Sequence, residues 1–151
     1  MSGSLRHDHE AIVALVCAYP ERLDAGDLDG VAALFQHGSF RSGRDGSVRS
    51  GRDEVRAMYD PLVIYADGMP RTKHVLGNIE VDVDGAAATA RCTFTVLQAT
   101  PDGPLRAVLA GRYHDRFTFD DGSWQFEERV VHPDLIGALS DHMGPPRRPD
   151  A

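Results

Sequence analysis

Apolar residues recur at helical spacing through the first part of the chain. Between Leu5 and Leu23 they gather on one side and predict a first helix, in which Pro20 predicts a kink because its ring clashes with the preceding turn. Gly26 and Asp27 then supply a helix stop followed by a helix start, since glycine tolerates the left-handed cap and aspartate accepts from free N–H groups. The apolar positions of the two helices are Ile12, Val13, Val16, Tyr19 and Leu23, followed by Leu28, Val31, Leu34 and Phe35.

A third helix is predicted after a segment rich in Gly, Ser and Arg. That segment, residues 39–51, predicts a short strand or hairpin with its turn at Asp45-Gly46. Ser50, with Asp53 three residues later, resembles a capping box in which Asp replaces Glu or Gln. The helix that it opens has its apolar face at Val55, Met58, Tyr59, Leu62 and Val63.

After Pro70 the hydrophobic period changes from helical to two, which predicts strands. Turn signals divide this half of the chain at Asp84-Gly85, at Pro101-Asp102-Gly103 and at Asp121-Gly122. The predicted strands are His74 to Val83, Ala86 to Val96, Leu105 to Phe119 and Ser123 to His132. In the first strand the alternation sets Val75, Ile79, Val81 and Val83 on one face, and His74, Asn78, Glu80 and Asp82 on the other. A short helix is predicted from Asp134 to Met143.

Helices first and a hairpin-linked meander second is the order of an α+β fold. The loops between the long strands are too short for a parallel crossover, so antiparallel pairing is predicted. One sheet face must be covered by the helices, and a strongly curved sheet would leave a pocket between the two layers. We predict a single domain over residues 1–143, followed by a disordered tail over residues 144–151.

Charge and composition exclude several partners. The formal net charge is −7, and Arg147-Arg148 is the one basic run, which argues against a nucleic-acid surface and against an anionic membrane. No apolar stretch approaches a membrane span, and the first ten residues lack the order of a signal peptide, so a cytoplasmic protein is predicted. Cys17 and Cys92 have no CxxC partner and are interpreted as reduced core residues.

Four residues have side chains suited to proton-transfer chemistry: Tyr19, Asp24, His74 and Arg129. Each alone has an ordinary structural interpretation as a core phenol, a helix cap, a hydrogen-bonded strand histidine or a paired arginine. Their order is more informative, because it sets a Tyr and an Asp at the end of the first helix, a His at the start of the first long strand and an Arg on the last strand.

From about Asp8 to His132 the chain resembles the SnoaL-like branch of the nuclear-transport-factor-two-like superfamily. The segments that resemble it are YPERLDAGDLDGVAALF, RTKHVLGNIEVDVDG, GRYHDRF and WQFEER. The resemblance implies a cone-shaped α+β barrel in which the N-terminal helices lie in the concave face of a curved, mainly antiparallel sheet. It also implies self-association as a homodimer or homotrimer.

The resemblance extends to lyases of this superfamily: scytalone dehydratase, bile acid dehydratase and hexachlorocyclohexane dehydrochlorinase. In these enzymes an Asp near the end of the first helix pairs with a strand His, and Asp24 and His74 match those positions. Tyr19 matches a Tyr of the bile acid enzyme where the dehydrochlorinase has Lys, so the chain departs from a dehalogenase. Arg129 matches an active-site Arg on the last strand of both.

This set of side chains suits the removal of a proton beside a carbonyl or a leaving group. His74 would act as base, Asp24 would fix its tautomer, Tyr19 would donate to a developing oxyanion, and Arg129 would hold an oxygen. The implied substrate is a small apolar, aromatic or polycyclic, polyketide-like molecule. The expected pocket residues are Leu23, Phe35, Met58, Leu62, Val96 and Tyr113.

No metal and no cofactor are predicted. His7, His9, His114, His132 and His142 are scattered without ligand spacing, and no Gly-rich phosphate loop is present. Two alternatives to the lyase or isomerase stay open. One is a non-catalytic binding or assembly module of the same fold, and the other is a polyketide cyclase in which Asp24 alone does the acid–base work.

Overall fold

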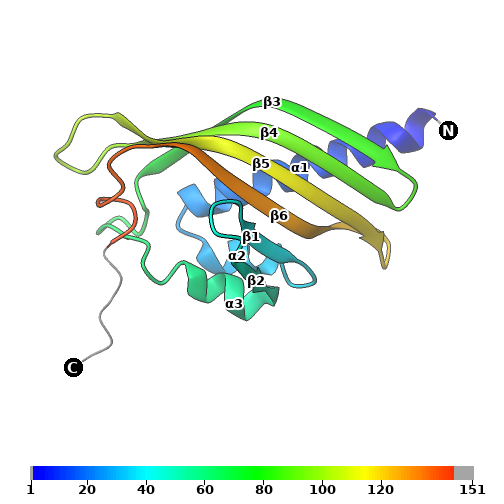
Figure 1. Cartoon of the computed structure of the whole chain (residues 1–151), viewed down its shortest axis with the longest axis horizontal. Helices are drawn as coiled ribbons and strands as arrows, with labels where there is room; N and C mark the ends of the chain where they lie inside the picture. Colours follow the sequence, from blue (N-terminus) through cyan, green and yellow to red (C-terminus); the bar gives the residue numbers. More distant parts are fainter. Residues whose placement is uncertain (1, 145–151) are drawn as a thin grey trace.

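The computed structural model describes residues 2–144, and residues 145–151, which hold nearly all of the predicted tail, lie outside that range. Four long strands follow three helices and a small hairpin along the chain (Figure 1). The elements are α1 (Ser2–Asp24), α2 (Leu28–Ala33), β1 (Ser39–Ser42), β2 (Val48–Ser50), α3 (Gly51–Met58), β3 (Thr72–Asp84), β4 (Ala87–Gln98), β5 (Arg106–Asp120) and β6 (Ser123–Ile136).

The strands form one sheet in the order β2-β1-β6-β5-β4-β3. The long strands β3 to β6 pair antiparallel in chain order, as predicted, and only the short β1 runs parallel to its neighbour β6. The sheet curves over α1, while α2, α3 and the β1–β2 hairpin lie below it (Figure 1). This is the predicted α+β architecture, with the helices on the concave face.

The connection from α1 to α2 follows the predicted turn chemistry. Gly26 has a positive φ of 76°, and the Asp27 side chain accepts from the Gly30 N–H at 2.9 Å. Pro20 lies inside α1, and the helix continues past it to Asp24. Because proline has no N–H to give to Val16, that carbonyl lacks its usual helical donor, and Arg129 Nη2 donates to it at 3.5 Å. Pro20 therefore leaves the backbone carbonyl of Val16 available to accept a hydrogen bond from the buried Arg129.

A β-bulge changes the face on which His74 lies. The register of β3 against β4 shifts between Gly77 and Glu80, and Asn78 adopts a positive φ of 53°. The extra residue reverses the alternation, so His74 shares the inner face with Ile79, while Val75 is 52% exposed. The predicted grouping of Val75 with Ile79, Val81 and Val83, opposite His74, is wrong for this reason.

Two other local predictions are also wrong. The predicted helix from Asp134 to Met143 is absent, because β6 continues to Ile136 and pairs there with Leu109 of β5. Residues 137–144, here called the C-terminal segment, form turns and a single bridge from Met143 to Leu62. At the start of α3 the Ser50 side chain caps nothing, and Glu54, rather than Asp53, accepts the Ser50 N–H at 2.7 Å.

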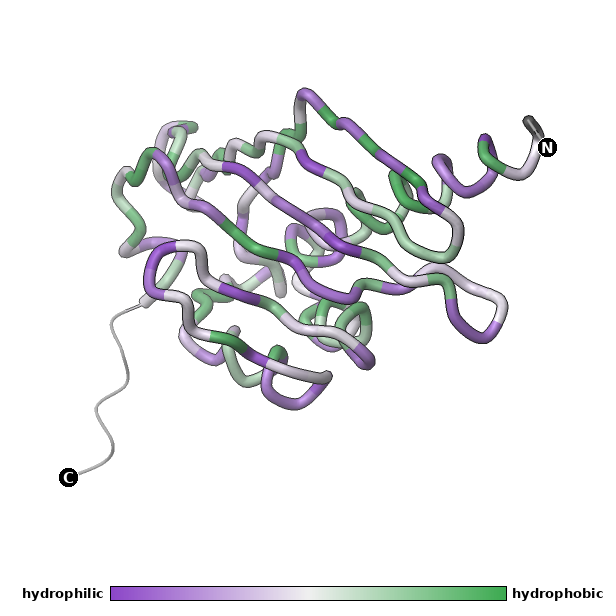
Figure 2. Tube along the Cα trace, turned by 45° about the vertical axis from the view of Figure 1, so that its right-hand side comes forward, coloured by the Kyte–Doolittle hydropathy of each residue, from purple (hydrophilic) through white to green (hydrophobic). Residues whose placement is uncertain are grey.

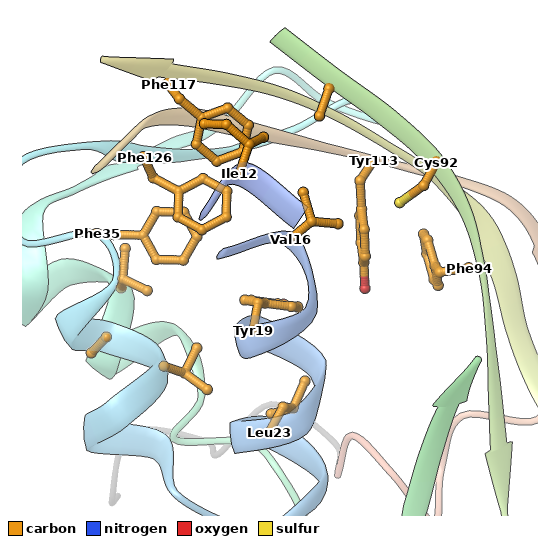
Figure 3. Close-up of a cluster of buried hydrophobic side chains, with 14 of the residues drawn as sticks. Ile12, Val16, Tyr19, Leu23, Phe35, Cys92, Phe94, Tyr113, Phe117 and Phe126 are labelled. Atoms are coloured by element: carbon orange, nitrogen blue, oxygen red, sulfur yellow. The ribbon is translucent and has the colours of Figure 1, made fainter. Parts of the chain in front are cut away.

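The core lies between α1 and the concave face of the sheet. Purple and green stretches alternate along the long strands, as expected of strands with one face buried (Figure 2). Figure 3 shows the rings of Phe35 and Phe126 stacked beside α1, with centroids 5.0 Å apart. On the other side of the helix Tyr113 stacks on Phe94 at 4.4 Å. These aromatic pairs fix α1, and with it the end that holds Asp24.

Candidate active site

Asp24 ends α1 beside β3, the last strand of the sheet. An edge strand presents N–H groups that no neighbouring strand can accept, and the Asp24 carboxylate takes one of them. Its Oδ2 accepts the backbone N–H of His74 at 2.8 Å, and its Oδ1 accepts the hydroxyl of Thr72 at 2.8 Å. The helix end is therefore joined to the start of β3 by side-chain hydrogen bonds.

The same carboxylate contacts the imidazole of His74. Nδ1 of His74 lies 2.6 Å from Oδ1 of Asp24, and the side chains are only 4% and 13% exposed. The predicted hydrogen-bond contact between the two residues is therefore present. Three donors now converge on one carboxylate, which holds the ring in a fixed orientation.

The charge of Asp24 determines the tautomer of His74. Burial acts to raise the pKa of the Asp24 carboxyl, but the hydrogen bonds from the His74 ring, the His74 backbone and Thr72 outweigh it and lower the pKa. An ionised carboxylate can only accept, so Nδ1 of His74 carries the hydrogen. In the neutral ring the lone pair is then on Nε2, the atom that can accept a proton.

A groove of about 820 Å³ runs between α1 and β3, and Asp24 and His74 lie in its wall. Its apolar wall includes Pro20, Leu76 and Ile79, and its charged lining residues include Lys73 and Arg71. The other lining residues are Cys17, Glu21, Ala25, Met69, Thr72, Leu97, Ala99 and Leu105. A small, mainly apolar molecule suits such a surface.

Tyr19 and Arg129 come together elsewhere, inside the core. The Arg129 guanidinium is fully buried, donates to both oxygens of Asp115 at 2.8 Å, and lies 4.8 Å from the Tyr19 ring centroid. Burial opposes this charge, but Asp115 outweighs it and raises the pKa of Arg129. The Tyr19 hydroxyl bonds to the hydroxyl of Tyr59, and burial raises the pKa of both phenols. Neither Tyr19 nor Arg129 lines the groove.

The six expected pocket residues do not line this groove either. Leu23, Phe35, Leu62, Val96 and Tyr113 are buried members of the hydrophobic core, and Met58 packs partly buried against them. Their helical and strand spacing is equally typical of plain core, and that is where the structure places them. The walls of the groove come instead from the last turns of α1, from β3 and from neighbouring residues that include Leu97 and Leu105.

A family model described as the SnoaL-like domain matches residues 5–130. The chain belongs to the SnoaL-like family. A search of curated proteins finds no match. Among solved structures, Rv3472, a protein of unknown function from Mycobacterium tuberculosis, is 27% identical with a TM-score of 0.73, covering 89% of this chain and 76% of that one.

Other solved structures share the fold of this SnoaL-like chain at lower identity. An NTF2-like protein with a cystatin-like fold from Novosphingobium aromaticivorans is 24% identical, with a TM-score of 0.74 and coverage of 91% and 88% of the two chains. A candidate scytalone dehydratase from the same organism is 23% identical, with a TM-score of 0.71 and coverage of 99% and 100%. The fold of the SnoaL-like domain is therefore NTF2-like and cystatin-like.

Sequence reasoning missed one histidine of this SnoaL-like domain. His142, in the C-terminal segment, is 6% exposed, and its Nδ1 is buried without a hydrogen-bond partner among residues 2–144. Burial, and to a lesser extent the nearby His74, lower its pKa to about 4, against a smaller opposing effect of Asp24. No local pattern marks this residue, because its burial depends on packing against distant parts of the chain.

The buried His142 is expected to weaken the fold in mild acid. Its pKa is about 4 in the folded protein and about 6.5 in the unfolded chain. Between these values the unfolded state binds the extra proton, so the free energy of unfolding decreases as the pH is lowered. The free energy of unfolding should drop by about 2 kcal/mol more between pH 7 and pH 5 in the wild type than in His142→Leu. Urea unfolding at the two pH values measures this difference, and equal drops would contradict it.

Within residues 2–144 no group of three or more His, Cys, Asp or Glu side chains is arranged to hold a metal ion. None of the helices in that range has the length and apolar character needed to cross a membrane. Cys17 and Cys92 are both free thiols.

Proposed function

We propose that this SnoaL-like protein is a cofactor-independent lyase or isomerase in which His74, held by Asp24, removes a proton from carbon. The observation that supports this most directly is the 2.6 Å contact between His74 Nδ1 and Asp24 Oδ1 in the wall of the groove. A histidine fixed in this way presents the lone pair of Nε2 as a base. The substrate class is a small, mainly apolar cyclic or polyketide-like molecule with a carbonyl.

The proposed reaction is an elimination or isomerisation. Nε2 of His74 takes the proton, and the electron pair of the broken C–H bond forms a double bond as the leaving group departs or the carbonyl becomes an enolate. Asp24 stabilises the imidazolium that forms, since its charge faces Nδ1–H. The imidazolium then returns the proton to the departing oxygen in a dehydration, or to another carbon in an isomerisation.

The pair of Asp24 and His74, here called the dyad, also bears on the polyketide cyclase alternative. A lone acid–base aspartate would keep its carboxylate directed at the substrate, whereas here Oδ1 and Oδ2 of Asp24 accept from His74 and Thr72. This arrangement favours His74 as the group that meets the proton. The candidate scytalone dehydratase among the structural neighbours is consistent with the same class of chemistry.

The proton-abstraction step can be tested with 5-nitrobenzisoxazole. A base removes its ring C–H, the N–O bond breaks, and a coloured cyanonitrophenolate is released. His74→Gln is expected to lower kcat by roughly 10²–10⁴-fold with a smaller change in KM, because general-base catalysis is lost and the groove stays in place. His9→Gln, a change of an exposed histidine on α1, serves as the matched control and should leave the rate unchanged.

Equal kcat values in the wild type and in His74→Gln would overturn the proposal. So would an absence of catalysis in the wild type when the probe is bound, which amide chemical shifts along β3 can establish. Either result would leave the non-catalytic binding module as the better account of the groove.

A further inference from the structure

Thr72 shares one oxygen of Asp24 with the ring of His74. The Thr72 hydroxyl donates to Oδ1 of Asp24 at 2.8 Å, and Nδ1 of His74 lies 2.6 Å from the same atom. All three residues line the groove, and Thr72 is itself buried. Oδ1 therefore accepts from two donors, of which only one belongs to the proposed base.

The sheet holds the Thr72 side chain in place. Thr72 is the first residue of β3 and pairs in register with Gln98 of β4. The buried Gln98 amide donates to the carbonyls of Pro70 and Asp141, both at 3.0 Å, and so fixes the chain just before this strand. A β-branched side chain also has few rotamers to choose from. The hydroxyl is therefore directed at Asp24 by the strand, and not by the hydrogen bond alone.

This hydroxyl is not required to orient the carboxylate. His74 already contacts both oxygens of Asp24, Oδ1 through its ring and Oδ2 through its backbone N–H, and these two contacts fix the carboxylate plane. What Thr72 adds is a second claim on the charge of Oδ1. An oxygen that accepts from two donors has less negative charge for each of them, so the hydrogen bond to Nδ1 is weaker than it would be alone.

We propose that Thr72 is a positioning residue that acts through Asp24 and helps His74 to release the proton that it has removed. The inference rests on the proposed function, since it concerns the second half of the same reaction. By weakening the hydrogen bond from Nδ1–H to Asp24, Thr72 makes the imidazolium less stable. The Nε2–H bond then breaks more readily, its electron pair stays on Nε2, and the proton goes to the departing oxygen or to another carbon. The site is therefore adapted to substrates that take the proton back, as in a dehydration or an isomerisation.

The elimination of 5-nitrobenzisoxazole separates the two halves of the reaction, because it needs proton removal but no return of the proton to the product. Thr72→Val removes the hydroxyl and keeps the shape of the side chain. It should raise kcat by about twofold to fivefold with KM unchanged, since His74 becomes a stronger base and the rate follows base strength in part. Thr72→Ser keeps the donor and should behave like the wild type. Thr89→Val, the same change at an exposed site of β4, is the matched control and should leave kcat unchanged.

A second measurement needs neither substrate nor turnover. The ¹H resonance of Nδ1–H moves to lower field as its hydrogen bond to a carboxylate strengthens. In protein with ¹⁵N-labelled histidine, the His74 signal should therefore lie at lower field in Thr72→Val than in the wild type or in Thr72→Ser.

An unchanged His74 signal in Thr72→Val would overturn the inference. A kcat that stays the same or falls in this variant would overturn it as well, because the hydroxyl would then not limit the strength of the base. If the signal moves as expected but His74→Gln keeps full elimination activity, the proposed function fails and the coupling of Thr72 to His74 stands.

Discussion

Asp24→Asn is expected to reduce the elimination of 5-nitrobenzisoxazole by roughly 10²–10⁴-fold, as much as the loss of the base itself. The carboxylate accepts from His74 Nδ1, from the His74 backbone and from Thr72, and an amide has only one oxygen for these three donors. If the NH₂ of Asn faces Nδ1, the ring must take the other tautomer and loses the lone pair at Nε2. If the NH₂ of Asn faces the backbone N–H of His74 instead, these two donors face each other with no acceptor between them.

This variant should also be less stable, by about 1–3 kcal/mol, since one buried donor is left without an acceptor. The loss of rate is therefore to be measured as kcat at a temperature where urea unfolding shows the variant fully folded. Asp60→Asn, a change of an exposed carboxylate that pairs with Arg56, is the matched control and should change neither quantity appreciably.

The double variant decides whether the two residues act together. If Asp24 works only through His74, Asp24→Asn combined with His74→Gln should lose no more rate than either single change. Losses that multiply would mean that Asp24 has an independent role, which is the cyclase alternative. Asp24→Asn with wild-type kcat would remove the dyad from the mechanism.

The fold could be predicted because its signals are local. Alternating strands separated by Asp-Gly and Pro-Asp-Gly turns admit little other than an antiparallel meander, and Gly26-Asp27 begins α2 as its residue types require. The bulge in β3 could not be predicted because a single Asn with positive φ gives almost no signal in the sequence. One inserted residue nevertheless moves every later side chain of the strand to the opposite face of the sheet.

The candidate site was predicted unevenly for a related reason. The contact of Asp24 with His74 was anticipated from the resemblance, although the period-two pattern had put His74 on the wrong face. The pairing of Arg129 with Asp115 depends on register between β5 and β6. The burial of His142 depends on a segment that was expected to be helical and instead packs beside residues 61–63. Long-range packing of this kind leaves no periodic trace in the sequence.

Arg129→Met should lower the free energy of unfolding by about 3–5 kcal/mol, the largest stability effect that we expect from a single change in this protein. The side chains of Arg129 and Asp115 are both 0% exposed, so the substitution leaves a carboxylate buried without its counter-ion. The guanidinium also lies 4.0 Å from the Tyr113 ring centroid and 5.0 Å from that of Phe126, contacts that methionine restores only in part.

A surface pair of the same type provides the control. Arg91 and Glu80 lie 2.6 Å apart but are 66% and 65% exposed, so Arg91→Met should cost less than about 1 kcal/mol. Urea unfolding at pH 7 measures both variants. Similar small losses of unfolding free energy in Arg129→Met and Arg91→Met would mean that water reaches Asp115 and that Arg129 and Asp115 are not a buried charge pair.

Removing both charges should restore most of that stability. Arg129→Met combined with Asp115→Leu replaces a buried ion pair by apolar groups, an exchange that is often close to neutral, whereas either single change leaves a bare charge. The folded double variant then separates stability from catalysis. Because Asp115 neutralises Arg129 and neither residue lines the groove, we expect its kcat for 5-nitrobenzisoxazole to equal that of the wild type. A large loss of kcat in this folded variant would instead give Arg129 the contact with substrate oxygen that the family resemblance implies.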